Sequence, residues 1–150
     1  SKVGEGSYGI IYKAISKNTN QKVALKRVSI SPVKDISPTI LREIGILKEC
    51  NHNNIICLKS VIYNYSLYST DIYIVMEYVP TDLHDYLKKN TCQSSTVKVI
   101  MCQLFHAMNY FHSKFFLHRD LKPQNILIYP ETKLVKITDL GSVVNLFHWI

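Results

Sequence analysis

Residues 118–125 read His118-Arg119-Asp120-Leu121-Lys122-Pro123-Gln124-Asn125. The carboxylate of Asp120 stands five positions before the amide of Asn125, and the positive charge of Lys122 lies between them. This spacing allows one loop to contact a hydroxyl nucleophile, a transferring phosphate and a metal ion together. The alternative interpretation is a chance loop that holds a buried ion pair, and the fixed order of eight residues argues against it.

The octapeptide resembles the catalytic loop of protein kinases, H-R-D-L-x-x-x-N. The Lys122-Pro123 pair is typical of Ser/Thr kinases, and Gln124 narrows the resemblance to the cyclin-dependent kinases. The resemblance implies an enzyme that transfers the γ-phosphoryl group of Mg-ATP to a protein hydroxyl. In such an enzyme Asp120 orients the hydroxyl and accepts its proton, while Lys122 steadies the transferring phosphate.

A second motif, Asp139-Leu140-Gly141, follows Asn125 by fourteen residues, where kinases carry Asp-Phe-Gly. The resemblance implies that Asp139 and Asn125 together hold Mg²⁺, which bridges the phosphate oxygens of ATP. Leu140 is smaller than the usual Phe but keeps most of its apolar volume. We therefore expect a less rigid active arrangement that still binds the metal.

Near its start the chain reads Gly4-Glu5-Gly6-Ser7-Tyr8-Gly9, a G-x-G-x-x-G pattern that brings backbone N–H groups close to phosphates. Dinucleotide-binding folds share this pattern, but they need a helix after the glycines and an acid about twenty residues on. Here the glycines lead into a β-rich run, and residues 23–29 contain no acid. The pattern therefore predicts a kinase lid over the ATP phosphates.

The tip of this lid is Ser7-Tyr8. The matching pair in cyclin-dependent kinases is phosphorylated to inhibit the enzyme. A phosphate there would repel the γ-phosphate of ATP and disturb the lid. A solvated loop tip is the alternative interpretation.

Lys26 ends a β-rich apolar run, and Glu43 lies on the apolar face of a predicted helix together with Ile40, Ile44 and Leu47. A carboxylate on a buried face needs a cation, because an unpaired buried charge is strongly unfavourable. We predict that Lys26 pairs with Glu43. The resemblance implies that this pair holds the ammonium where it bridges the α- and β-phosphates.

The segment Ser37-Pro38-Thr39-Ile40-Leu41-Arg42-Glu43 resembles the PSTAIRE helix, which docks cyclins in cyclin-dependent kinases. Ser37 is the expected N-cap of a helix from Thr39 to Cys50, and Pro38 fits its first turn. The resemblance implies a cyclin-like partner at the Ser37–Cys50 helix, and the departure from PSTAIRE leaves its identity open. Gly45 should weaken this helix by about 1 kcal/mol relative to Ala, which is compatible with a helix that a partner sets in place.

Residues 74–79 read Ile74-Val75-Met76-Glu77-Tyr78-Val79 and resemble the hinge between kinase lobes. The resemblance implies that Met76 stands at the back of the adenine pocket and that the backbone of Glu77 and Val79 hydrogen-bonds the base. Asp82 matches the position that meets the ribose. The residues implied to sandwich the adenine are Val3, Ile11, Ala24 and Leu127. Each alone could equally be a core or surface residue, and their joint spacing favours the pocket.

Hydrophobic periodicity predicts an α+β fold with a β-rich first part and a helical second part. We expect strands at residues 10–15, 22–28, 57–63, 72–78, 126–128 and 134–137, a loop at 64–71, and helices at 82–88 and 96–113. In the last helix one buried stripe is expected from Val97, Met101, Leu104, Phe105, Met108 and Phe111. The resemblance implies an incomplete protein-kinase fold: residues 1–79 as the small lobe and hinge with a truncated first strand, and residues 80–150 as the beginning of the large lobe.

Residues 142–150 lack the features of an activation segment, which in this family is the partner of Arg119. We therefore interpret the chain as the N-terminal half of a cyclin-dependent-kinase-like Ser/Thr kinase that uses ATP and Mg²⁺. The competing hypothesis is a catalytically dead fragment that acts as a nucleotide- or cyclin-binding module. A dinucleotide oxidoreductase is a third alternative.

The 150 residues are 47% hydrophobic with a mean hydropathy of +0.01, which is typical of a soluble globular protein. The longest apolar run, residues 72–76, is too short to cross a bilayer. The net charge of +7 is scattered, which favours a solvated basic surface over nucleic-acid binding. We expect an intracellular protein of the nucleus or cytoplasm, with a protein substrate and without nucleic-acid or membrane partners. The cysteines form no C-x-x-C pair and are expected to be ordinary thiols: Cys50, Cys57, Cys92 and Cys102.

Overall fold

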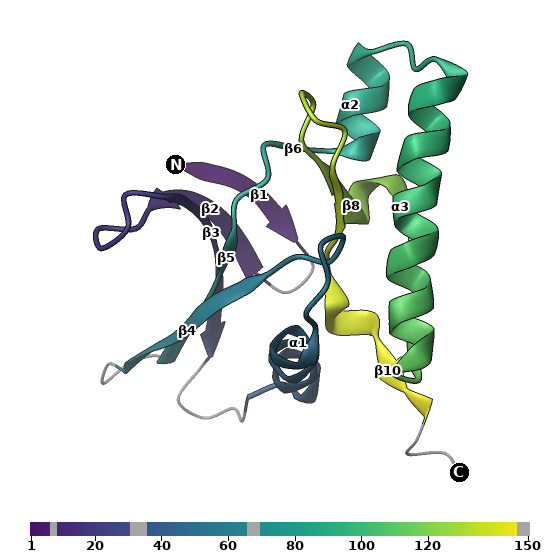
Figure 1. Cartoon of the computed structure of the whole chain (residues 1–150). Coiled ribbons are helices and arrows are strands. Elements are labelled where there is room, and N and C mark those ends of the chain that lie inside the picture. The colour runs from purple at the N-terminus through teal and green to yellow at the C-terminus, as the bar shows by residue number, and fades with distance from the viewer. Residues whose placement is uncertain (7–8, 31–35, 66–69, 147–150) are drawn as a thin grey trace.

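The computed structural model describes residues 1–6, 9–30, 36–65 and 70–146. Ser7 and Tyr8, the expected lid tip, and the apolar tail at 147–150 lie outside the described residues. Figure 1 shows a β-sheet on one side, the helices α2 and α3 on the other, and α1 between them. The architecture confirms the predicted α+β fold.

The first part is a five-stranded antiparallel sheet in the order β1-β2-β3-β5-β4. The β2–β3 and β4–β5 pairs are the two predicted hairpins. The expected loop at 64–71 is shorter than predicted, because the β-branched and aromatic residues of β4 extend the strand through Tyr65. The strands are β1 (Lys2–Gly6), β2 (Gly9–Ile15), β3 (Lys22–Ile30), β4 (Leu58–Tyr65) and β5 (Thr70–Glu77).

Gly9 begins β2 and has a positive φ of 156°. A Cβ at this position would lie 2.2 Å from the backbone oxygen of Arg27 in β3, well inside van der Waals contact. Only glycine therefore allows β2 to pair with β3 this closely. Gly9 thus has a structural role in the sheet, separate from the phosphate contact that its motif implies.

Helix α1 (Pro38–Glu49) forms where the sequence predicts it, between β3 and β4. Its N-cap is Ser37, whose hydroxyl accepts a hydrogen bond from the backbone N–H of Thr39 at 3.3 Å, and Pro38 occupies the first turn. The face turned to the sheet is apolar apart from one carboxylate. Its buried residues are Ile40, Glu43, Ile44, Ile46 and Leu47.

The second part contains helices and short strands that frame two loops. A three-stranded sheet has the order β6-β8-β9, and a two-stranded sheet pairs β10 with β7. The elements are β6 (Thr81–Asp82), α2 (Leu83–Lys89), α3 (Ser94–Ser113), β7 (Phe116–Leu117), the 3₁₀ turn η1 (Pro123–Asn125), β8 (Ile126–Ile128), β9 (Val135–Ile137), the 3₁₀ turn η2 (Leu140–Ser142) and β10 (Val144–Asn145).

The stripe predicted on α3 is wrong in part. Leu104 and Phe111 are buried as expected, but Val97, Met101 and Phe105 are 45%, 42% and 65% exposed. The prediction merged two neighbouring faces of the helix, and periodicity alone could not tell which of them packs. The face that packs inward consists of Ile100, Leu104, Ala107 and Phe111.

The segment between α1 and β4 connects the two parts of the chain. Asn54 donates its side-chain amide to the Val135 oxygen of β9 at 2.9 Å and to the Gln103 side chain of α3 at 2.8 Å. Backbone hydrogen bonds join Asn54 and Ile56 to Ile137 at 2.8 and 2.9 Å. One continuous cluster of buried apolar side chains therefore extends from the sheet and α1 to α3. Among the described residues, no helix combines the length and apolar character needed to span a bilayer.

Gly45 sits on the exposed side of α1, and a Cβ there would meet no other heavy atom within 4 Å. Gly45→Ala should therefore raise the free energy of unfolding by about 0.5–1 kcal/mol, because alanine loses less backbone entropy in a helix. Urea denaturation followed by circular dichroism measures the change. Gly9→Ala is the control and should destabilise the chain, because its Cβ meets backbone. A Gly45→Ala variant less stable than wild type would contradict this account of α1.

Candidate active site

A cavity of about 430 Å³ lies between the five-stranded sheet and the β6-β8-β9 sheet. Its walls contain ten of the residues implied for ATP, namely Val3, Gly4, Ile11, Ala24, Lys26, Met76, Glu77, Val79, Asp82 and Leu127. Glu43, Asn125 and Asp139 also line it. Of the glycine motif, Gly4 lies in this lining. Sequence reasoning did not assign the lining residues Tyr12, Ile56, Pro80, Thr81, Asp85 and Thr138.

A second depression, of about 570 Å³, is more open and lies between the end of α1 and β4. It is lined by apolar side chains, two thiols, the polar side chains of Asn51, Ser60 and Tyr63, and the lysines Lys48 and Lys59. None of the catalytic-loop residues reaches it. The smaller cavity is therefore the candidate active site.

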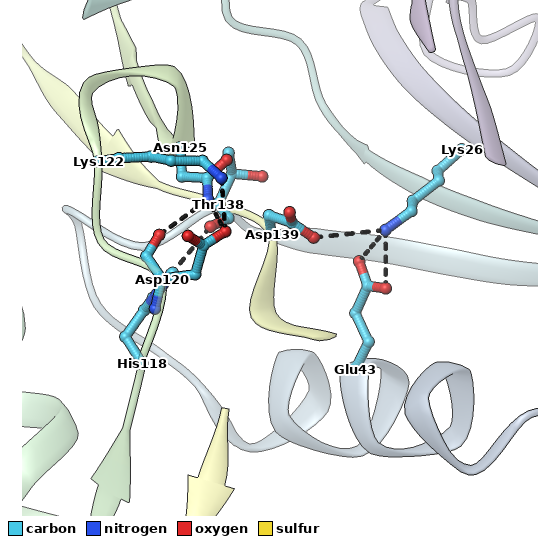
Figure 2. Close-up of polar contacts among 8 residues, drawn as sticks. All are labelled: Lys26, Glu43, His118, Asp120, Lys122, Asn125, Thr138 and Asp139. Atoms are coloured by element: carbon cyan, nitrogen blue, oxygen red, sulfur yellow. Dashed lines mark hydrogen bonds and ion pairs between the residues drawn. The ribbon is translucent and has the colours of Figure 1, made fainter. Parts of the chain in front are cut away.

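The predicted pair of Lys26 and Glu43 is present at the inner end of the cavity. The Lys26 ammonium donates to both carboxylate oxygens of Glu43, at 2.7 and 2.8 Å, and the two side chains are only 7% and 3% exposed. Asp139 Oδ1 lies 3.8 Å from the same ammonium, as Figure 2 shows. The pair thus fixes α1 against β3 and presents a positive charge beside Asp139.

The catalytic-loop residues also meet as the motif predicts. Asp120 Oδ2 accepts hydrogen bonds from Lys122 Nζ at 2.8 Å and from Asn125 Nδ2 at 2.9 Å (Figure 2). Asn125 Nδ2 also donates to the backbone oxygen of Asp120 at 2.9 Å. The loop therefore closes on itself and holds the carboxylate at its centre.

His118 holds this loop to the strand that leads to Asp139. The backbone N–H of Asp120 donates to His118 Nδ1 at 3.3 Å, so the other ring nitrogen carries the proton and donates to the Thr138 oxygen at 3.1 Å. The imidazole is only 2% exposed and packs edge-on against Phe111. The sequence does not predict this role of His118, because its partner Thr138 lies twenty residues away.

Arg119 and Asp139 both have positive φ angles, 64° and 60°. Such angles are uncommon for residues other than glycine and store strain. Arg119 Nε donates to the backbone oxygen of Ser142 at 2.7 Å, so its guanidinium is engaged by the residue that ends η2. Arg119 lies in the loop that carries Asn125, and Asp139 lies in the Asp-Leu-Gly turn. Each of the two loops that carry a candidate metal ligand therefore contains a strained residue.

Asn125 and Asp139 fit a magnesium ion in the chemistry of their donors. Mg²⁺ binds oxygen and is usually held by one or two carboxylates, with phosphates and water completing its shell. The amide nitrogen of Asn125 is engaged by Asp120, and its Oδ1 accepts no hydrogen bond from the described residues. The Thr138 N–H donates to the Asn125 backbone oxygen at 3.0 Å, which brings the two loops side by side. No cluster of three or more His, Cys, Asp or Glu occurs among the described residues, so the phosphates of a nucleotide would have to complete the site.

Asp82 has a structural contact of its own. Its side chain accepts a hydrogen bond from the backbone N–H of Asp85 at 2.8 Å and caps the N-terminus of α2. Asp82 still lines the cavity, so its implied contact with a ribose stays a prediction. Leu140, which replaces the usual Phe, is fully buried in the core, and the expected loss of rigidity also stays a prediction.

The sequence model of the family described as protein kinase domain matches residues 1–148. The chain belongs to the protein kinase family. A curated relative, "Cyclin-dependent kinase 1" of Encephalitozoon cuniculi (strain GB-M1), is 42% identical over 146 residues, which cover 93% of this chain and 48% of the relative. The chain therefore spans about half the length of this curated relative, and the resemblance to cyclin-dependent kinases is confirmed.

The kinase fold also excludes the dinucleotide-binding alternative. In the described residues the glycine motif is followed by strand β2, whereas a dinucleotide-binding loop opens a helix. The three elements that kinases use for ATP, the β3 lysine, the catalytic loop and the Asp-x-Gly turn, reach one cavity.

The hydrogen bond from Lys122 holds the pKa of the Asp120 carboxyl below its usual value. Because this pKa is lower in the folded kinase than in the unfolded chain, the folded state keeps Asp120 ionised to a lower pH. Ionised Asp120 therefore stabilises the fold at pH values above its unfolded-state pKa. This stabilisation is lost as the pH falls through the folded-state pKa. Lys122→Ala should raise the pKa of Asp120 toward its ordinary value. A carbon-13 NMR titration of the Asp120 carboxyl measures the change.

Lys88→Ala is the control, because Lys88 pairs with Asp85 on α2 at 3.9 Å and should leave the titration of Asp120 unchanged. An Asp120 titration that Lys122→Ala does not move would contradict the hydrogen bond as the cause.

Proposed function

We propose that this kinase transfers the γ-phosphoryl group of Mg-ATP to a serine or threonine hydroxyl of a protein. The observation that carries the proposal is the convergence, at one cavity, of the buried Lys26–Glu43 pair with Asp139 and with Asn125, whose side-chain amide holds the Asp120 carboxylate. The residues come from β3, α1 and two loops that are far apart in sequence. Structural ion pairs alone would not require Lys26, Asn125 and Asp139 to face the same space.

Asp120 is placed to act on the hydroxyl. Its Oδ2 is occupied by Lys122 and Asn125, while its Oδ1 accepts no hydrogen bond from the described residues. The substrate hydroxyl would donate to Oδ1, its oxygen would attack the γ-phosphorus, and the bond from that phosphorus to the β-phosphate oxygen would break as ADP leaves. The lowered pKa keeps Asp120 ionised but makes it a weak base, so the carboxylate would first orient the hydroxyl and would take its proton as the bond to phosphorus forms.

Lys26 and Lys122 supply positive charge for the phosphates. Lys26 is held by Glu43 and would face the α- and β-phosphates, and Lys122, with a half-exposed side chain, would neutralise charge on the group in transfer. Asn125 and Asp139 would hold Mg²⁺, which offsets the negative charge of the phosphate oxygens. The adenine would lie between Ala24 and Leu127, against the hinge.

We also propose that α1 receives a cyclin-like partner. Leu41, Arg42, Gly45 and Lys48 are all exposed and fall on one face of the helix, and Leu41 is an apolar side chain that is 51% exposed. Glu43 points the other way, to Lys26. A partner on this face would press on the helix that carries Glu43, which links docking to the position of the active-site ammonium.

The test of the proposed function is phosphotransfer from radiolabelled ATP by the full-length protein with its partner present. Asp120→Asn should lower turnover by about 10²–10⁴-fold, because the amide cannot accept the proton, and Lys26→Met should abolish detectable transfer. Glu131→Gln, at an exposed acid between β8 and β9, is the matched control and should act like wild type. Turnover at the wild-type level in Asp120→Asn or Lys26→Met would contradict the role assigned to that residue.

A further inference from the structure

Two residues of the β8–β9 hairpin hold the hinge, although neither lines the cavity. Lys136 Nζ of β9 forms an ion pair with Glu77 Oε1 at 2.8 Å. The hydroxyl of Tyr129, directly after β8, donates to the backbone oxygen of Tyr78 at 3.1 Å. The hairpin therefore contacts two consecutive hinge residues, Glu77 and Tyr78, from outside the cavity.

Glu77 is held on further sides. Its Oε1 also accepts a hydrogen bond from the backbone N–H of Cys57 at 2.7 Å, and its own N–H donates to the Cys57 oxygen at 3.0 Å. The side chains of Lys136 and Glu77 are only 10% and 18% exposed. These contacts fix both the side chain and the backbone of Glu77. Loss of the ion pair would leave a largely buried charge on Glu77 or Lys136 without its partner.

The same hairpin forms the opposite wall of the adenine site. Lys136 pairs in register with Leu127 of β8, and Leu127 pairs with Asp82 of β6. Leu127 and Asp82 both line the cavity. The Lys136–Glu77 ion pair therefore fixes the hinge relative to the wall that would cover the base.

We propose that Lys136, Glu77 and Tyr129 are positioning residues that hold the backbone of the hinge in its adenine-binding geometry before a nucleotide arrives. This inference rests on the proposed function, because it concerns ATP at the same site. A hinge without these contacts would have to be ordered on binding, and the lost conformational freedom would weaken affinity for the base. The phosphate end of the site, held by Lys26 and Glu43, would not be affected.

The test compares two probes, adenosine and Mg-ATP, by isothermal titration with the full-length protein. Lys136→Met should weaken the affinity for both probes by a similar factor, about five- to tenfold, as expected for loss of a charged contact. Glu77 in this variant keeps the N–H of Cys57 and some access to water, so we expect it to fold. Lys26→Met combined with Glu43→Gln, which leaves no unpaired buried charge, provides the contrast: it should weaken Mg-ATP binding much more than adenosine binding.

A double variant separates positioning from stability. Lys136→Met combined with Glu77→Gln leaves no unpaired charge and should restore most of the melting temperature. The hinge would still lack its tether, so adenosine should still bind about fivefold more weakly than to wild type. Asp71→Asn is the matched control, because it breaks the 2.8 Å ion pair between Arg27 of β3 and Asp71 of β5, the strand that also carries Glu77, away from the hinge. This control should lose stability without losing adenosine affinity.

Tyr129→Phe removes one hydroxyl only and is the second single variant, with an expected two- to threefold loss of adenosine affinity, as for one neutral hydrogen bond. Adenosine affinity that recovers together with stability in the double variant, or that falls equally in Asp71→Asn, would overturn the inference. So would wild-type adenosine affinity in both Lys136→Met and Tyr129→Phe. A wild-type protein that binds neither probe would contradict the proposed function itself.

Discussion

The structure depends on the ion pair of Lys26 and Glu43. Neither charge could be buried alone, so α1 must lie against the sheet with Glu43 turned toward β3. The turn that carries Asp139 then packs against α1: a Cβ on Gly141 would lie 3.3 Å from the Thr39 side chain and 3.6 Å from Glu43 Oε2. One buried pair thus sets the positions of α1, of the Lys26 ammonium and of the turn that carries Asp139. A displacement of α1 would therefore move all three.

The site stores strain that the rest of the fold compensates. Arg119 and Asp139 adopt left-handed backbone angles that cost on the order of 1–3 kcal/mol each for residues of this kind. Arg119 bonds the Ser142 oxygen, and His118 joins the catalytic loop to Thr138, beside Asp139. These contacts cross from one loop to the other, so each loop is held in place by its neighbour. Such fixed placement of charged side chains before a substrate binds is expected in a catalytic site.

The sequence predicted what local pattern and motif spacing encode. The cap at Ser37, the hairpins, the catalytic-loop contacts and the Lys26–Glu43 pair followed from short-range chemistry and from a carboxylate on an apolar face. Contacts between distant segments could not be predicted. Lys136 looks like an ordinary exposed lysine of a strand, and only the fold brings it to Glu77. The stripe on α3 failed for a related reason, because Val97 and Phe105 are apolar at helical spacing but lie beside the face that packs.

The central claim is that Asn125 and Asp139 hold the metal of a bound nucleotide beside Lys26. Paramagnetic relaxation by Mn²⁺, added with a non-hydrolysable ATP analogue to the nitrogen-15-labelled protein, tests it most directly. The account predicts that the amide signals of Asn125 and Asp139 broaden first and only when the analogue is present, while that of Ser60 in β4 stays sharp. Broadening that is centred elsewhere, or that does not require the nucleotide, would contradict the account.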